Sequence, residues 1–240
     1  QVNDCDTNKP FFAKILRRNK YKDRENINSY KQYRENLSNE LNIISQLNHP
    51  SIIKYIGFSS VGFSQKHQPA ILTEFVQNGS LSKIIQAAKE NPGSFTLNDT
   101  QKLINIYGIA LGMSYLHDYN ILHRNITPSS ILENENYYPI ISNFDFAYVL
   151  EDDEIVHTQQ GFNFGIPSFI APETYSKHQY SKKTDVYSFG MTIYSLLTNE
   201  IPFLDKQSTE ISNEIAQGKR PEFKTPIPES YKKLIEACWD

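Results

Sequence analysis

The sequence contains little cysteine and no long apolar run. Its two cysteines, Cys5 and Cys238, lie near opposite ends of the 240 residues. A small secreted domain held together by disulfides would contain more of them, so we expect a reducing, cytoplasmic environment. Charged or strongly polar residues also interrupt every window of about 18 residues, the length that a membrane-spanning helix needs. We therefore expect no membrane contact from this segment.

An excess of positive charge is missing too. Lysine and arginine number 24 against 27 aspartates and glutamates, which gives a net charge of −3. Nucleic-acid-binding domains concentrate basic residues on one face, so we expect no nucleic-acid partner. What is present is ordinary globular composition, with 39% hydrophobic and 12% aromatic residues. A chain of this length can form one large domain or two small lobes.

Periodicity predicts strands in the first third of the chain and helices later. Apolar runs typical of strands occupy residues 10–16, 51–58, 70–76, 120–123, 130–133 and 138–142. Apolar residues at helical spacing occupy residues 30–47, 100–117, 182–198 and 229–238. A long polar loop is expected at about 145–170. This order favours an α+β protein of two unequal lobes.

Several motifs occur in a fixed order along the chain. Residues 121–132 (ILHRNITPSSIL) resemble the catalytic loop of protein kinases, and residues 140–147 (IISNFDFA) resemble their metal-binding segment. Residues 165–173 (GIPSFIAPE) resemble the end of the activation segment, and residues 184–190 (TDVYSFG) the start of the large C-lobe helix. The ACWD at 237–240 is similar to the end of tyrosine-kinase-like domains. Together the motifs identify the chain as resembling the protein kinase superfamily, of the Ser/Thr or tyrosine-kinase-like type.

The resemblance implies a bilobal protein-kinase-like fold in a single domain. A small, β-rich N-lobe with one helix would span about 1–76, and a larger helical C-lobe about 80–240. The Gly-rich phosphate loop and the last C-lobe helix are expected outside residues 1–240. By motif position, Tyr55, Ile44, Phe144 and His123 would stack as an internal spine.

The resemblance also implies ATP and Mg²⁺ as cofactors and gives roles to the residues around them. Lys14 stands at the ATP-contacting lysine and Glu40 at its helix partner, although a lone Lys or Glu is more often solvated. Glu74 and Val76 stand in the hinge beside the adenine, with Thr73 before them as gatekeeper. Leu132 would lie beneath the ring.

Four positions depart from the kinase pattern at the points where the reaction takes place, one of them Thr127 in place of the loop lysine that contacts phosphate. Asn125 replaces the aspartate that accepts the proton of the substrate hydroxyl, and an amide cannot take up a proton near neutral pH. Asn143 replaces the aspartate that binds magnesium, a hard cation that favours carboxylate and phosphate oxygens. Ser130 replaces the second metal ligand with a shorter side chain. These changes put the binding of ATP and Mg²⁺ in doubt and predict a severe loss of catalysis.

Two further positions leave alternatives open. Asp145 stands where kinases have glycine, and it either supplies a replacement metal ligand or is a solvated loop acid, which is the favoured reading. Phe12 stands where kinases have a small alanine. Its ring either turns inward, packs against Leu132 and fills the adenine position, or points elsewhere.

The functional prediction is a pseudokinase that serves as an allosteric or scaffold partner of another protein, such as an active kinase or signalling protein. The alternative is a weakly active, ATP-dependent Ser/Thr protein kinase that uses Asp145 or an unusual metal geometry. A third reading is a kinase-like binding module without any nucleotide role.

Overall fold

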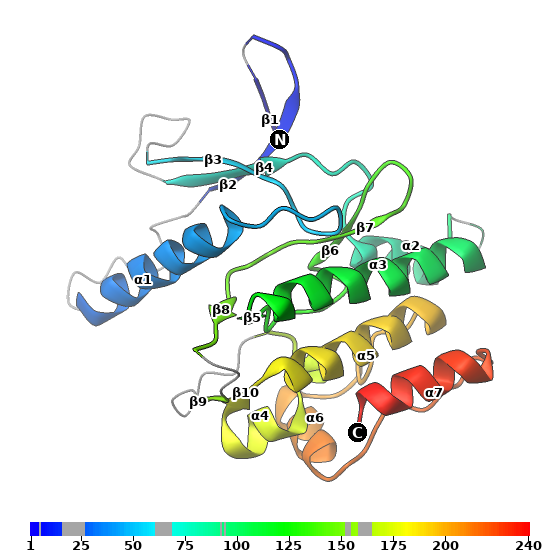
Figure 1. Ribbon diagram of the computed structural model, residues 1–240. Coiled ribbons are helices and arrows are strands. Elements are labelled where there is room, and N and C mark those ends of the chain that lie inside the picture. Colours follow the sequence, from blue (N-terminus) through cyan, green and yellow to red (C-terminus); the bar gives the residue numbers. More distant parts are fainter. Residues whose placement is uncertain are drawn as a thin grey trace.

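The computed structural model describes residues 1–4, 6–15, 27–60, 69–91, 93, 95–151, 155–157 and 165–240. Cys5 lies outside this part of the chain. Among the described residues a small strand-rich N-terminal part stands above a helical C-terminal part (Figure 1). The predicted α+β class is confirmed.

A four-stranded antiparallel sheet forms most of the N-terminal part. In the order β1-β2-β4-β3, its strands are Val2–Asn3, Pro10–Ile15, Ala70–Glu74 and Tyr55–Ser59. The register sets Phe12 opposite Thr73 and Lys14 opposite Ile71. Because strand side chains alternate between the two faces, residues 12 and 14 point to the same side of the sheet. Helix α1 (Ile27–Ile44) lies beside the sheet (Figure 1).

The predicted strand at 51–58 is wrong in its first half, because β3 begins only at Tyr55. Ile52 and Ile53 precede it in a connecting segment, and both are buried. The N–H of Ile53 donates to the carbonyl of Ile141 at 2.9 Å. The apolar run therefore joins the two parts of the molecule, which explains its composition without a continuous strand.

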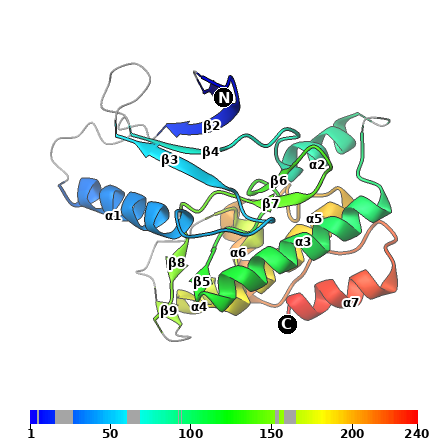
Figure 2. The same cartoon turned by 45° about the horizontal axis from the view of Figure 1, so that its top comes forward.

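The C-terminal part is mainly helical. Its helices are α2 (Leu81–Glu90), α3 (Asp99–Asp118), α4 (Pro172–Lys177), α5 (Lys182–Thr198), α6 (Ser208–Ala216) and α7 (Glu229–Cys238). Its short strands are β5 (Ile121–Leu122), β6 (Ile131–Glu133), β7 (Pro139–Ile141), β8 (Tyr148–Val149), β9 (Val156–His157) and β10 (Gln179–Tyr180). A 3₁₀ turn occupies Pro167–Phe169. Figures 1 and 2 both show α3, α5 and α7 stacked on the side away from the sheet.

Capping and close packing fix the central helices. Asn98 and Gln101 form a reciprocal capping box at the start of α3, and Ser181 and Thr184 form a similar pair at the start of α5. A Cβ on Gly190 would stand 2.7 Å from the Cβ of Cys238. Only glycine therefore permits this approach of α5 to α7.

In the described part of the chain, no helix combines the length and the apolar character needed to cross a membrane.

Candidate functional site

A cavity of about 590 Å³, the front cavity, lies between the sheet and the C-terminal part, along the segment that joins them. Residues from both parts line it, among them Phe12, Lys14, Glu40, Val76, Leu132 and Asn143. Most of the residues assigned to the site from sequence are therefore brought to one place. Asn125, Ser130 and Asp145 stand just outside the lining, on the segments beneath and beside it.

Lys14 is held at the inner end of the cavity by two carboxylates. Its Nζ lies 2.8 Å from Oε1 of Glu40, which comes from α1, and it also contacts the carboxylate of Asp145. Burial alone would lower the pKa of Lys14, but the two carboxylates outweigh it and hold this pKa above its usual value. The lysine is therefore charged, and two carboxylates face its one ammonium group.

The favoured reading of Asp145 as a solvated loop acid is wrong. The backbone of Asn143 adopts a left-handed conformation with φ of 67°, which asparagine tolerates better than most residues. Phe144 then enters the core and meets the His123 ring edge-on at a centroid distance of 4.9 Å. This turn leaves Asn143 facing the cavity and brings the Asp145 side chain to Lys14.

The catalytic loop uses its polar groups internally. His123 is fully buried, and burial lowers the pKa of its imidazole, so the ring is neutral. Its Nε2 donates to the carbonyl of Ser142 at 3.0 Å, and its Nδ1 accepts from the N–H of Asn125 at 3.3 Å. Asp185 from α5 accepts from the N–H groups of His123 and Arg124 at 2.9 and 2.8 Å. These contacts fix the loop's shape and leave Asn125 as a nearly buried amide.

Ser130 belongs to this internal network. Its buried hydroxyl lies within hydrogen-bonding distance of the loop carbonyls of Asn125 and Thr127, the latter at 2.9 Å, which share its single proton. Its oxygen accepts from the N–H of Thr127 at 3.0 Å. Its own carbonyl accepts from the hydroxyl of Ser142 at 2.9 Å. A hydroxyl engaged in this way does not project toward a metal in the cavity.

The residues present do not fit magnesium. Asn143 offers a neutral amide, Ser130 is turned into the loop, and the Asp145 carboxylate is taken by Lys14. Among the described residues, no three acidic, histidine or cysteine side chains form a group that could hold a metal ion. Magnesium prefers an octahedral set of oxygens that includes carboxylates or phosphates.

Phe12 lies at the wall of the cavity. It is 49% exposed, and Leu132 lines the same cavity from β6. Space of about 590 Å³ remains between the lobes, so the interpretation that Phe12 fills the adenine position is not confirmed. The aromatic ring contributes to the wall of the cavity and is half exposed to solvent.

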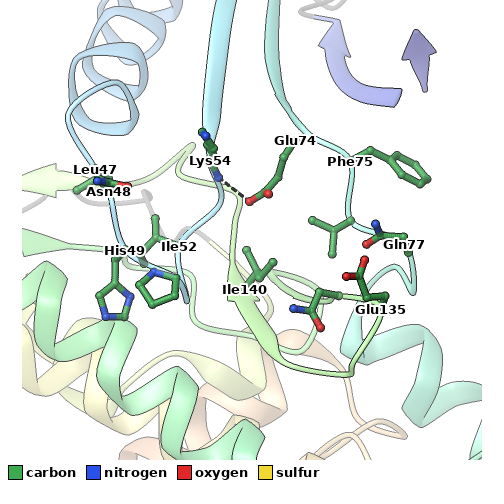
Figure 3. Close-up of a pocket in the computed structure, with 13 residues that line it drawn as sticks. Leu47, Asn48, His49, Ile52, Lys54, Glu74, Phe75, Gln77, Glu135 and Ile140 are labelled. Carbon is green, nitrogen blue, oxygen red and sulfur yellow. Dashed lines mark hydrogen bonds between the residues drawn. The ribbon is translucent and has the colours of Figure 1, made fainter. Parts of the chain in front are cut away.

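The hinge separates this cavity from a second one. Glu74 turns its carboxylate to the rear, where Oε1 accepts from the N–H of Lys54 at 2.9 Å (Figure 3). The rear cavity measures about 510 Å³, and Ile140 and Glu135 contribute to its wall. Glu74 also lines the front cavity, where it was placed from sequence, but its carboxylate is bonded to Lys54 in the wall of the rear cavity. Nothing in the sequence pattern indicated the rear cavity.

A buried carboxylate beneath the hinge also escaped the sequence reasoning. Glu133 has no solvent exposure, and burial raises the pKa of its carboxyl to about 8. The amide of Asn105 on α3 approaches it at 3.4 Å. Its backbone holds the turn that follows the hinge, because its N–H donates to the carbonyl of Gly79 and its carbonyl accepts from the N–H of Asn78. The only sequence signal was one acid within an otherwise apolar strand run.

The comparisons with known proteins agree with this architecture. Residues 22–240 match the family described as protein tyrosine and serine/threonine kinase. A protein of Acanthamoeba polyphaga mimivirus whose name describes a serine/threonine-protein kinase/receptor is 33% identical over 202 residues, covering 83% of this chain and 12% of its own length.

Two eukaryotic relatives give the same result. Serine/threonine-protein kinase 12 of Arabidopsis thaliana is 30% identical over 207 residues, covering 83% of this chain and 42% of its own length. Ephrin type-A receptor 5 of Rattus norvegicus is 32% identical over 212 residues, covering 87% of this chain and 20% of its own length. The chain thus spans less than half the length of each of these relatives. By fold, motif order and sequence similarity, it belongs to the protein tyrosine and serine/threonine kinase family.

Proposed function

We propose that this protein-kinase-like domain is a pseudokinase, which acts by presenting a fixed, closed shape to a protein partner in signalling. One observation carries the proposal. Lys14 and Glu40 remain paired at 2.8 Å, while the positions for proton transfer and metal binding hold Asn125, Ser130 and Asn143.

The missing groups act on one reaction. Phosphoryl transfer depends on positioning the nucleophile and on neutralising the phosphate charge with metal ions and cations. Loss of a general base alone reduces the rate by about 10²–10⁴-fold. Asn143 and Ser130 replace the metal ligands as well. The loss of the base and the loss of the metal ligands therefore weaken the stabilisation of the same transition state.

The retained groups act on shape instead. Ile44 of α1, Phe144 and His123 are all nearly or fully buried, and Phe144 and His123 are in ring contact. Packed interiors of this kind resist gradual deformation. A domain whose lobes are held in one arrangement offers a constant surface, and we propose that another kinase or signalling protein in the reducing cytoplasm recognises it.

A second candidate function is a weakly active, ATP-dependent Ser/Thr protein kinase. The observation in its favour is the contact of Asp145 with Lys14, which places one carboxylate close to where phosphates would lie. In that case Asp145 would exchange Lys14 for a metal ion when the nucleotide binds.

A phosphotransfer assay decides between the two candidates. The full-length protein is incubated with radiolabelled ATP, Mg²⁺ and a general protein substrate, next to Lys14→Ala and the Asn125→Asp, Asn143→Asp double variant. The pseudokinase proposal expects the unaltered protein to label no more than Lys14→Ala, and the double variant to gain activity. Robust labelling by the unaltered protein that Lys14→Ala abolishes would overturn it.

A further inference from the structure

The charges at the inner end of the front cavity are unbalanced. Lys14 contributes one positive charge, and Glu40 and Asp145 place two carboxylates within contact distance of its Nζ. With both carboxylates ionised the sum is −1, and burial together with the Asp145 carboxylate raises the pKa of Glu40, because two acids share one lysine. The side chain of Glu40 is 6% exposed and that of Asp145 is 35% exposed, so water screens the second carboxylate only in part.

Among the described residues that line the cavity, no other cation corrects this balance at the inner end. In the described lining the second cation is Lys83 of α2, and its aliphatic stem runs beside Gly79, next to the hinge. Glu74 has turned its carboxylate to the rear, toward the N–H of Lys54. An anionic group that approached Lys14 would therefore meet the carboxylate of Asp145 without a compensating charge.

A magnesium ion would normally supply that charge, since it bridges the phosphates of a bound nucleotide. Asn143 and Ser130 do not fit this role, for the reasons given above. Each additional phosphate on a ligand thus adds repulsion at the inner end of the cavity and gains no metal contact.

The remaining surface favours a flat, uncharged ligand. Phe12 from the sheet and Leu132 from the C-terminal part line the cavity from opposite lobes. The hinge supplies a polar group between them. The backbone N–H of Val76 makes no hydrogen bond within the described residues, so it is free to donate to a ligand in the cavity. Most ligand sites combine apolar walls with a few such polar groups.

We propose that the front cavity binds an uncharged heteroaromatic ligand of the nucleoside class and disfavours nucleoside triphosphates, with Asp145 as the residue that determines this specificity. The inference rests on the proposed function, because it takes the metal site to be lost. It goes further in naming the class of ligand that the cavity selects.

Calorimetric titrations of the full-length protein with adenosine, AMP, ADP and ATP, each with and without Mg²⁺, test the inference. Adenosine is expected to bind most tightly, with affinity falling at each added phosphate and with no recovery on adding Mg²⁺. Asp145→Asn removes the charge at nearly constant size, and it should tighten ATP binding about tenfold and change adenosine binding less than about twofold. Asp118→Asn, an exposed acid on α3, is the matched control and should change neither.

Three results would overturn the inference. The first is tighter binding of Mg·ATP than of adenosine, above all if Asp145→Asn abolishes it, because Asp145 would then be a metal ligand. The second is no binding of adenosine, and the third is an unchanged ATP affinity in a folded Asp145→Asn protein. If this variant fails to fold, the nucleotide series on the unaltered protein still decides. These outcomes can be told apart from failure of the proposed function. An inactive protein that prefers Mg·ATP would refute only the proposed ligand class. Phosphotransfer by the unaltered protein would refute only the pseudokinase role.

Discussion

The two sides of the front cavity match the kinase pattern in different ways. On the N-terminal side, Lys14 and Glu40 occupy the expected positions and are paired. On the C-terminal side, Asn125 and Asn143 occupy the expected positions with a changed chemistry. The loop that carries them nevertheless keeps its buried contacts to Asp185. The contacts that hold the loop in shape are therefore present where the carboxylates of the kinase pattern are replaced, although the two sets of residues lie only a few positions apart.

The largest expected effect comes from the scaffold of the C-terminal side. Asp185→Ala removes the acceptor of two backbone N–H groups, those of His123 and Arg124. Leaving buried donors unpaired should lower the free energy of unfolding by about 3–5 kcal/mol, measured by chemical denaturation. Asp185→Asn keeps one acceptor oxygen and should cost less. A loss below about 1 kcal/mol for the alanine variant would show that the loop shape does not depend on this contact.

The second effect concerns pH. Burial raises the pKa of Glu133 to about 8 in the folded protein, above its value in the unfolded chain. The folded state therefore binds the proton more strongly, and stability should fall as the pH rises from about 4.5 to about 8. Glu133→Gln cannot ionise and should be more stable than the unaltered protein at pH 9, by about 2 kcal/mol.

Denaturation curves at pH 5, 7 and 9 measure this effect. Glu135→Gln, two residues further along and exposed, provides the control and should leave the pH dependence unchanged. Parallel curves for the unaltered protein and Glu133→Gln across this range would contradict the raised pKa of Glu133.

A third, smaller effect distinguishes a structural role of Ser130 from a role in metal binding. Ser130→Ala removes a buried hydroxyl that bonds to the carbonyl and the N–H of Thr127. We expect a loss of about 1–2 kcal/mol in unfolding free energy and no change in the response of the melting temperature to Mg²⁺. A Mg²⁺-dependent stabilisation that disappears in this variant would instead restore Ser130 to the metal site.

The smallest expected effect lies on the N-terminal side. Lys14→Met leaves the buried carboxylate of Glu40 without its cation, and it should loosen α1. Because Lys14 is partly exposed, the expected cost is about 1 kcal/mol, or about a fivefold increase in hydrogen exchange of α1 amides. Lys54→Met changes an exposed lysine of the same part of the protein and should leave this exchange unchanged. Equal exchange in all three proteins would mean that the ion pair does not hold α1.

Strong local signals made part of the fold predictable. The helices at 182–198 and 229–238 were found at their observed bounds, since their apolar spacing is regular and proline or a capping serine marks their starts. Helix α2 was missed, although Leu81, Ile84 and Ile85 have helical spacing. Its pattern spans only ten residues and follows directly on a turn at Gly79.

The sequence predicted which residues of the site lie close together, but it did not predict how their side chains are oriented. The spacing of the motifs placed Lys14 and Glu40 together because the kinase pattern specifies both. The orientation of Asp145 depends on the left-handed backbone of Asn143 and on the anchoring of Phe144 in the core. Both are properties of the folded loop, and a motif that replaces glycine by aspartate contains no information on them.

The central claim is that the kinase-like domain has lost its metal site. The most direct test measures the binding of Mn²⁺, in place of Mg²⁺, by electron paramagnetic resonance in the presence of ADP. We expect no stoichiometric Mn²⁺ site in the unaltered protein and the appearance of one in Asn143→Asp, which returns a carboxylate to the wall of the cavity. Stoichiometric Mn²⁺ binding by the unaltered protein that is lost in Asp145→Asn would contradict this claim.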